Sequence, residues 1–289
     1  IDMTLISGVK KKKKNMNNPL TKSSQQPFGT IPFNEINKDD FIPAIDDAII
    51  EGNVEIESIV NNVEQPTFEN TILSFELSGA TLSRVASTYF HLFGSESDQS
   101  FQDLAQIISP KLAKYGSDIM LNEILFKKIK KVYDNKQLID EPEDIRLLEL
   151  TYLEFVRNGA NLDKKEKDIL RKLDEELSTL SPQFSNNTLN ATNAFELWLD
   201  KGDLDGLPDS IRDSAKVAAK AKDKDDKWLI TGQFPSFAPF LKFSSRRDLR
   251  EKVYKATNTK CNGGEFDNSL LCKKISKLKH KRAKILGYD

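Results

Sequence analysis

The stretch "PTFENTILSFELSGATLSRVASTYFHLF", residues 66–93, decides the fold class. Its apolar and small residues recur at alternating steps of four and three positions, the period of an α-helix that packs against neighbours along most of its length. Thr67 stands where it can cap this helix, and Gly79 would allow a neighbouring backbone to approach closely. We therefore predict one continuous helix here. The positions in the repeat are Phe68, Ile72, Phe75, Gly79, Leu82, Ala86, Tyr89 and Phe93.

The same period on both sides of this stretch predicts a mainly α-helical fold. A helix that begins at the Asp163 and Glu166 capping pair would bury Ile169, Leu170, Leu173, Leu177, Leu180 and Phe184. "FELWL" (195–199) and "KWLIT" (227–231) are instead typical of strands, which indicates a small strand-containing segment near 195–243. Other helices are expected over 41–63, 99–120 with an interruption at Pro110, 122–134, 143–158, 210–222, 246–256, and from 267 onward.

Composition excludes several classes of protein. With 43 basic and 44 acidic residues, the chain carries no net field that would attract nucleic acid. Cys261 and Cys272 are too few for a disulfide scaffold, so we expect a reducing, cytoplasmic environment. No run approaches the ~20 apolar residues that span a bilayer. In residues 1–16 the apolar piece precedes the lysines, the wrong order for a secretory signal, so we expect a disordered leader of upstream or vector origin.

Catalytic signatures are missing from the sequence. A zinc hydrolase needs about three side-chain ligands, yet His91 and His280 are the two histidines and neither begins a His-Glu-x-x-His motif. His91 is interpreted as a partly exposed helix residue and His280 as an ordinary solvated residue of the basic helix. No G-x-S-x-G supports a serine nucleophile, and neither cysteine has a nearby base. We therefore assign no catalytic, cofactor-binding or metal residue in this chain.

Two further patterns have a structural interpretation. Gly263-Gly264 is typical of a turn between helices rather than of a phosphate-binding loop. The carboxylates of Asp46 and Asp47, and of Glu55 and Glu57, are interpreted as a solvated helix face rather than as general acid–base groups.

The end of the chain, "CKKISKLKHKRAKILGYD" (272–289), is strongly basic. Such a helix could bind nucleic acid or an anionic membrane. However, residues 267–287 contain no aromatic side chain to stack on a base, apart from the histidine. The pattern favours a helix docked on other helices, with its cations facing solvent or another part of the protein. The docked row would be Leu271, Ile275, Leu278, Arg282 and Ile285.

Nine motifs in order resemble one known family. They are "NPL", "PFGTIPFNEINKDDFIPAIDDAI", "PTFENTI", "SPKLAKYGSDIMLNEILF", "RLLELTYLEFVRNGANL", "ELSTLSPQFSNNTLN", "DLDGLP", "FLKFSSRRDLREKVYKA" and "DNSLLCKKISKLKHKRAKILGYD". Together they cover residues 17–289 and are similar to the thimet oligopeptidase and peptidyl-dipeptidase family of zinc metallopeptidases. Within that family the likeness is to the bacterial peptidyl-dipeptidase branch.

The resemblance implies a helical fold like that of neurolysin and thimet oligopeptidase, with two domains across a deep channel. It also implies hydrolysis of short peptides, with release of C-terminal dipeptides, at a zinc ion held by a His-Glu-x-x-His helix and a downstream glutamate. Residues 17–289 match the N-terminal, channel-wall region, and none of the zinc-binding motif falls within them. We therefore expect a monomeric fragment that is inactive alone and binds no zinc, with short peptides and the missing C-terminal catalytic domain as partners, and neither nucleic acid nor membrane. The rival hypothesis is a stand-alone helical module that binds peptides or proteins.

Overall fold

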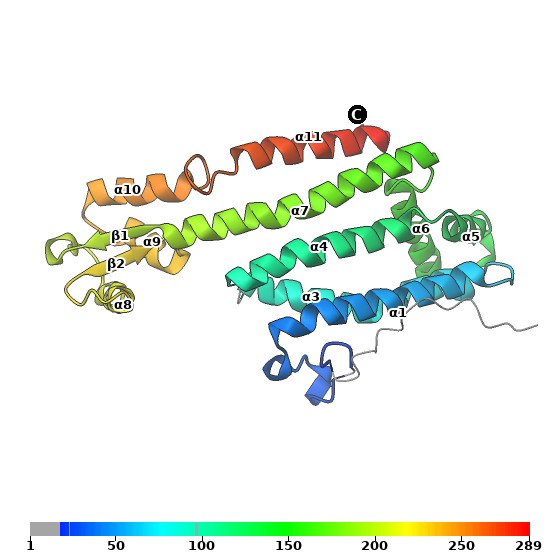
Figure 1. The fold of residues 1–289 in the computed structure, drawn as a ribbon, viewed down its shortest axis with the longest axis horizontal. Coiled ribbons are helices and arrows are strands. Elements are labelled where there is room, and N and C mark those ends of the chain that lie inside the picture. The colour runs from blue at the N-terminus through cyan, green and yellow to red at the C-terminus, as the bar shows by residue number, and fades with distance from the viewer. Residues whose placement is uncertain (1–17, 23, 96–97) are drawn as a thin grey trace, which may run out of the picture. The chain divides into compact units, whose positions relative to one another are not determined.

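The computed structural model describes residues 18–22, 24–95 and 98–289, and it confirms the mainly α-helical fold (Figure 1). The predicted leader, residues 1–16, lies outside the described residues. Within these ranges, no helix is both long enough and apolar enough to cross a membrane. The longer elements are α1 Phe41–Asn61, α3 Ala80–Ser95, α4 Gln99–Met120, α5 Glu123–Asp134, α6 Pro142–Arg157, α7 Lys164–Ala194, β1 Glu196–Leu199, α8 Asp209–Lys220, β2 Trp228–Thr231, α9 Phe234–Phe243, α10 Arg247–Asn258 and α11 Ser269–Ile285.

The chain forms two compact units. The first comprises the described residues up to Thr179 together with Lys281–Asp289 at the end of the chain. The second is Leu180–His280. Both α7 and α11 have residues in each unit. The region from residue 17 onward, treated as one in the sequence prediction, therefore contains two packing units.

Two clusters of buried side chains hold the first unit together. One lies among α1, α3 and α4, which run side by side in Figure 1, and it includes Phe41 and Tyr89, both fully buried. The other joins the second half of α1 to α5 and α6 and includes Ile72 and Phe155. Apolar residues at helical spacing thus supply both cores, as the periodicity indicated.

The predicted continuous helix over 66–93 is wrong. One turn of π-helix, Phe68–Leu73, continues into the short helix α2, Ser74–Glu76, and the chain then turns at 77–79 before α3 begins. Gly79 has φ of +70°, a left-handed conformation that cannot continue a right-handed helix. Its backbone N–H donates to Glu55 Oε2 at 2.7 Å. Gly79 therefore lies in the turn that separates α2 from α3, and it does not serve as the predicted point of close packing.

Two other helix predictions were also wrong in part. α4 runs through Pro110 without a break, because Ala105 and Ile108 on the same helix are fully buried and packing outweighs the local cost of the proline. In α7, Ile169 is 42% exposed and Phe184 is 37% exposed, so these two do not face the core as expected. Leu170, Leu173 and Leu180 in the same row are buried, as predicted.

The predicted end of α6 and the predicted start of α7 are confirmed. Gly159 follows α6 with φ of +93°. The backbone N–H of Glu166 donates to Asp163 Oδ1 at 2.8 Å, and the N–H of Asp163 donates to the Glu166 carboxylate at 3.3 Å. This is the expected capping box, which satisfies two N–H groups at the start of α7.

The second unit contains the predicted strand segment. β1 and β2 pair antiparallel, with Glu196 opposite Thr231 and Leu199 opposite Trp228. The core beside this pair includes Leu199 and Phe240, both fully buried. Phe240 comes from α9, a helix absent from the sequence prediction, because the prolines of "FPSFAPFLKF" obscured its period. Gly263 and Gly264 both have positive φ and form the expected turn before α11.

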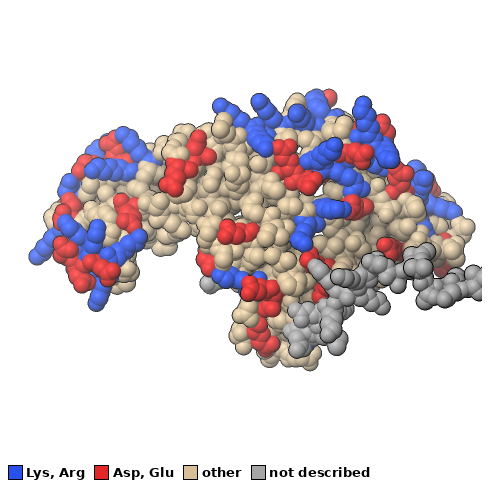
Figure 2. Space-filling model, viewed as in Figure 1, with Lys and Arg blue, Asp and Glu red and all other residues tan. Residues whose placement is uncertain are grey.

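α11 is docked by the predicted row. Leu278 is buried, and the Arg282 guanidinium binds Asp174 Oδ1 at 2.7 Å and Asn158 Oδ1 at 3.1 Å. The exposed cations of the helix lie away from this row, and Figure 2 shows Lys and Arg side chains along its outer side. The packed-helix interpretation is confirmed. The exposed lysines are Lys273, Lys274, Lys277, Lys279, Lys281 and Lys284.

Candidate functional site

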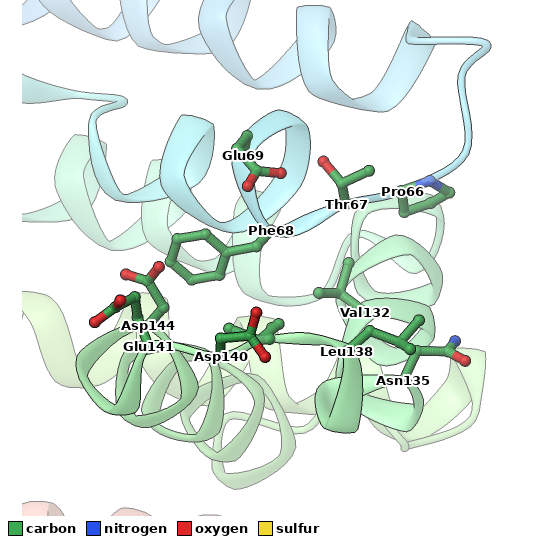
Figure 3. A pocket seen from close by; sticks show the side chains of 11 residues that line it. Pro66, Thr67, Phe68, Glu69, Val132, Asn135, Leu138, Asp140, Glu141 and Asp144 are labelled. Carbon is green, nitrogen blue, oxygen red and sulfur yellow. The ribbon is translucent and has the colours of Figure 1, made fainter.

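A cleft of about 480 Å³ opens in the first unit between three chain segments (Figure 3). We call it the Phe68 cleft. One wall is the turn that follows α1 together with the start of the π-helix, and the facing wall is the end of α5, the loop after it and the start of α6. The residues that line it are Pro66, Thr67, Phe68, Glu69, Val132, Asn135, Leu138, Ile139, Asp140, Glu141 and Asp144.

The first wall is fixed by a reciprocal cap. The Asn70 N–H donates to the Thr67 hydroxyl at 3.2 Å, and the Thr67 N–H donates to Asn70 Oδ1 at 2.8 Å. These bonds hold the "PTFEN" segment in one conformation. The Phe68 ring, which is 8% exposed, points from this wall toward the start of α6 (Figure 3).

The facing wall is held at both ends. At the end of α5, the Asn135 side chain donates to the Lys131 carbonyl at 2.8 Å. Beyond it, the Lys136 ammonium binds Glu149 at 2.7 Å, which ties the loop to α6. Pro142 occupies the first position of α6, where its missing N–H costs nothing. The loop that carries Leu138 to Glu141 is therefore short and anchored.

The cleft is acidic over an apolar floor. Its lining includes four carboxylates, those of Glu69, Asp140, Glu141 and Asp144. Within the described part of the chain, no lysine or arginine lines the cleft. The pKa of Glu69 lies below its usual value because its carboxylate accepts hydrogen bonds from its own N–H and from the Thr67 hydroxyl. The floor comprises Phe68 and Val132, both buried, with the exposed Leu138 at the edge.

Three of these carboxylates are unpaired within the ranges that the structure describes. The side chains of Asp140, Glu141 and Asp144 make no hydrogen bond or ion pair with any described residue. In Figure 3 all three lie on the α6 side of the cleft, across from Phe68. Asp144 lies in the first turn of α6, near the positive end of the helix dipole. The cleft therefore offers negative charge and apolar surface, which suit binding of a ligand rather than catalysis.

Metal ligation does not fit the residues that the structure describes. No group of three or more His, Cys, Asp or Glu side chains among them is placed to hold a metal ion, the carboxylates of the Phe68 cleft included. His91 on α3 and His280 on α11 are both exposed, as predicted. We therefore derive no catalytic step through zinc from this part of the chain.

The remaining candidate residues, two cysteines and two carboxylates of α1, have no arrangement that indicates catalysis among the described residues. Cys261 is partly buried and Cys272 is exposed, and both are free thiols. Asp46 pairs with Lys111, and the Glu55 carboxylate accepts the Gly79 N–H. The prediction of a simply solvated face is thus wrong for Asp46 and Glu55, because both carboxylates link α1 to other parts of the first unit.

Sequence reasoning missed the Phe68 cleft. Its acidic residues lie at 69 and at 140–144, and nothing in the helical period indicates that these segments meet. A usable signal was the run "DEPED" at 140–144, which places four carboxylates at one helix start.

No protein-family model matches the chain. Among curated proteins, it is 32% identical over 274 residues to the dipeptidyl carboxypeptidase of Salmonella typhimurium, 27% identical over 281 residues to oligopeptidase A of Escherichia coli, and 24% identical over 245 residues to saccharolysin of Saccharomyces cerevisiae. These matches cover 94%, 95% and 83% of this chain and 40%, 41% and 34% of the relatives. The chain thus spans about two fifths of the length of these two bacterial relatives.

Similarity along nearly the whole chain to proteins with these names confirms the resemblance that the nine motifs carried. The dipeptidyl carboxypeptidase of Escherichia coli matches at 31% identity, and its likeness and that of the Salmonella typhimurium protein agree with the predicted branch. The chain is similar, over almost its entire length, to proteins named dipeptidyl carboxypeptidase and oligopeptidase A.

Proposed function

We propose that this chain is the N-terminal, channel-wall part of a longer, cytoplasmic zinc metallopeptidase that hydrolyses short peptides and releases C-terminal dipeptides. The observation that carries the proposal is the match over 94% of the chain to a protein named dipeptidyl carboxypeptidase, of which the chain covers only 40%. Oligopeptidase A matches at lower identity, 27%, and this favours dipeptide release over internal cleavage.

The role of the described helices in this proposal is to bind and to restrict access. Long helices that are packed along most of their length form rigid walls, and ligand-binding sites commonly lie between such elements. Zinc, when bound by the remaining part of the protein, would polarise the peptide carbonyl and activate a water molecule. Because the described residues hold no fitting ligand set, the proposal places that metal outside them.

The nucleotide sequence beyond the codon for Asp289 tests whether the protein is longer. We expect an open reading frame that reaches a His-Glu-x-x-His motif and a downstream glutamate. A genuine stop codon directly after Asp289 would contradict the proposal and favour the stand-alone binding module.

Purified protein tests the division of labour. The 289-residue chain alone is expected to bind no stoichiometric zinc and to release no dipeptide from an N-terminally blocked peptide. The longer protein should bind zinc and release the dipeptide. Zinc content is measured by atomic absorption and dipeptide release by mass spectrometry. Hydrolysis by the shorter chain that is abolished by a chelator would show that the active site lies within it and would refute the assignment.

A further inference from the structure

We propose that the Phe68 cleft binds an arginine side chain, together with an adjoining apolar side chain, from an extended peptide segment. The inference concerns this cleft alone and does not depend on the proposed peptidase activity. It commits to a ligand of two parts because the cleft itself has two parts: an acidic side and an apolar floor.

The acidic side attracts a cation. Asp140, Glu141 and Asp144 gather on one side of the cleft without a cationic partner among the described residues. The lysine nearest along the chain, Lys136, is occupied by Glu149 at 2.7 Å. A planar guanidinium can donate to two carboxylate oxygens at once, and it is less strongly hydrated than an ammonium group. Arginine therefore fits this side better than lysine.

The floor requires an apolar group next to that cation. The ring of Phe68 points toward the side of the cleft that carries the carboxylates (Figure 3), so a guanidinium bound to them would lie beside apolar surface. Leu138 is 77% exposed at the other end of the cleft, although it is a large apolar side chain. An apolar residue beside the arginine would cover Leu138 and gain about 25 cal/mol for each Å² removed from water.

Size and ligand geometry exclude simpler occupants. The volume of about 480 Å³ lies within the ~300–1,000 Å³ of typical ligand pockets and far exceeds what a metal ion needs. The carboxylates are also not placed together closely enough to ligate a metal. A linear polyamine would satisfy the charge but would leave the Leu138 edge exposed. An extended peptide satisfies both parts of the cleft.

The test uses the complete 289-residue chain and a fluorescein-labelled peptide, Gly-Leu-Arg-Leu-Gly, with a blocked C-terminus. Binding is followed by fluorescence anisotropy. The matched control peptide carries citrulline in place of arginine, which keeps the shape and removes the charge. We expect the citrulline peptide to bind about tenfold more weakly, and the arginine peptide to weaken as salt rises from about 50 mM to about 300 mM.

Protein variants locate the site. Asp140→Asn and Asp144→Asn should each weaken binding of the arginine peptide by about two- to fivefold. Leu138→Ser should weaken both peptides, because it removes apolar surface without touching the charge. Glu143→Gln is the matched control, since Glu143 lies in the same helical turn as Asp144 and does not line the cleft. Its affinity should be unchanged, and circular dichroism should show that all variants remain folded.

The proposal is overturned by any of three results. The first is equal affinity for the arginine and citrulline peptides. The second is an affinity that Asp140→Asn and Asp144→Asn leave unchanged. The third is displacement of the peptide by spermidine or Ca²⁺ at concentrations equal to that of the peptide itself, which would mark the cleft as a general cation site. None of these measurements involves hydrolysis, so their failure is distinguishable from failure of the proposed function.

Discussion

At the scale of single residues, helix packing in the first unit depends on a position that has no side chain, Gly52. Gly52 is buried in α1, and a Cβ atom placed there would lie 2.2 Å from the hydroxyl oxygen of Tyr115 on α4. A Cβ atom and a non-bonded oxygen do not approach so closely, so any larger residue would displace the tyrosine. The helical period predicts close packing at Gly79, yet the structure requires it at Gly52.

Replacing Gly52 by alanine should destabilise the protein by ~1–3 kcal/mol, the usual cost of overpacking a core. Urea unfolding followed by circular dichroism measures the change. Gly116→Ala is the control, because a Cβ atom added to Gly116 on α4 would meet no described atom within 4 Å, and alanine there should raise stability by ~0.5–1 kcal/mol. Equal effects of the two substitutions would show that the Tyr115 contact is not what excludes a side chain.

The buried Tyr89 hydroxyl makes the folding stability of the protein sensitive to alkaline pH. Its hydroxyl is buried and donates to the Phe101 carbonyl at 2.6 Å, and burial raises its pKa well above the usual value of 10.0. Because the folded state keeps this proton while the unfolded state releases it, the stabilisation is complete below about pH 10 and is lost as pH rises beyond it. Burial raises the pKa of Tyr115 in the same direction, with a further contribution from Glu55.

We therefore expect the free energy of unfolding to fall as the pH rises above about 10. Tyr89→Phe should lower stability at pH 7 by ~1 kcal/mol through loss of the hydrogen bond, and it should also make the alkaline slope shallower. Urea titrations at a series of pH values measure both effects. An unchanged slope in the variant would mean that Tyr89 does not titrate as a buried group.

At the scale of elements, periodicity predicted which residues are buried better than it predicted where helices end. Phe68, Ile72, Leu82 and Tyr89 of the opening stretch are all buried, as expected. However, the helix they were assigned to breaks at Gly79. The side-chain period describes one face of the chain, whereas the break is a backbone event stabilised by a carboxylate 24 positions earlier, Glu55, which no local pattern contains.

Gly79→Ala should destabilise the protein by ~1–2 kcal/mol, because alanine at a left-handed φ is strained. Gly94→Ala provides the control, since Gly94 lies in α3 with open space around it and no positive φ. Thermal unfolding by circular dichroism compares the two variants. If Gly79→Ala were neutral, the chain could adopt the continuous helix of the sequence prediction instead.

At the scale of the whole molecule, the two compact units have separate buried cores, and the second unit has an optical probe of its own. Both tryptophans, Trp198 and Trp228, lie in the second unit, so their fluorescence reports on that unit alone. Circular dichroism reports on helices of both units. The two signals together can therefore show whether the units unfold as one.

Phe240 is fully buried in the second unit, and its replacement by alanine should cost ~3–5 kcal/mol there. We expect the tryptophan midpoint in urea to fall more than the circular dichroism midpoint. Ile72→Ala, in a core of the first unit, should produce the opposite pattern. Coincident shifts of both signals in both variants would show a single cooperative transition carried through α7 and α11.

The sequence by itself determined the helical fold class, the strand segment, the docked face of α11 and the family resemblance. These properties follow from local period, caps and ordered motifs, all of which are written along the chain. Only the tertiary structure decided the break at Gly79, the continuity of α4 through Pro110, the Gly52–Tyr115 contact and the Phe68 cleft. Each of these features depends on contacts between segments that are distant in sequence. Such contacts are set by the packing of whole helices, so the local pattern of a single segment does not predict them.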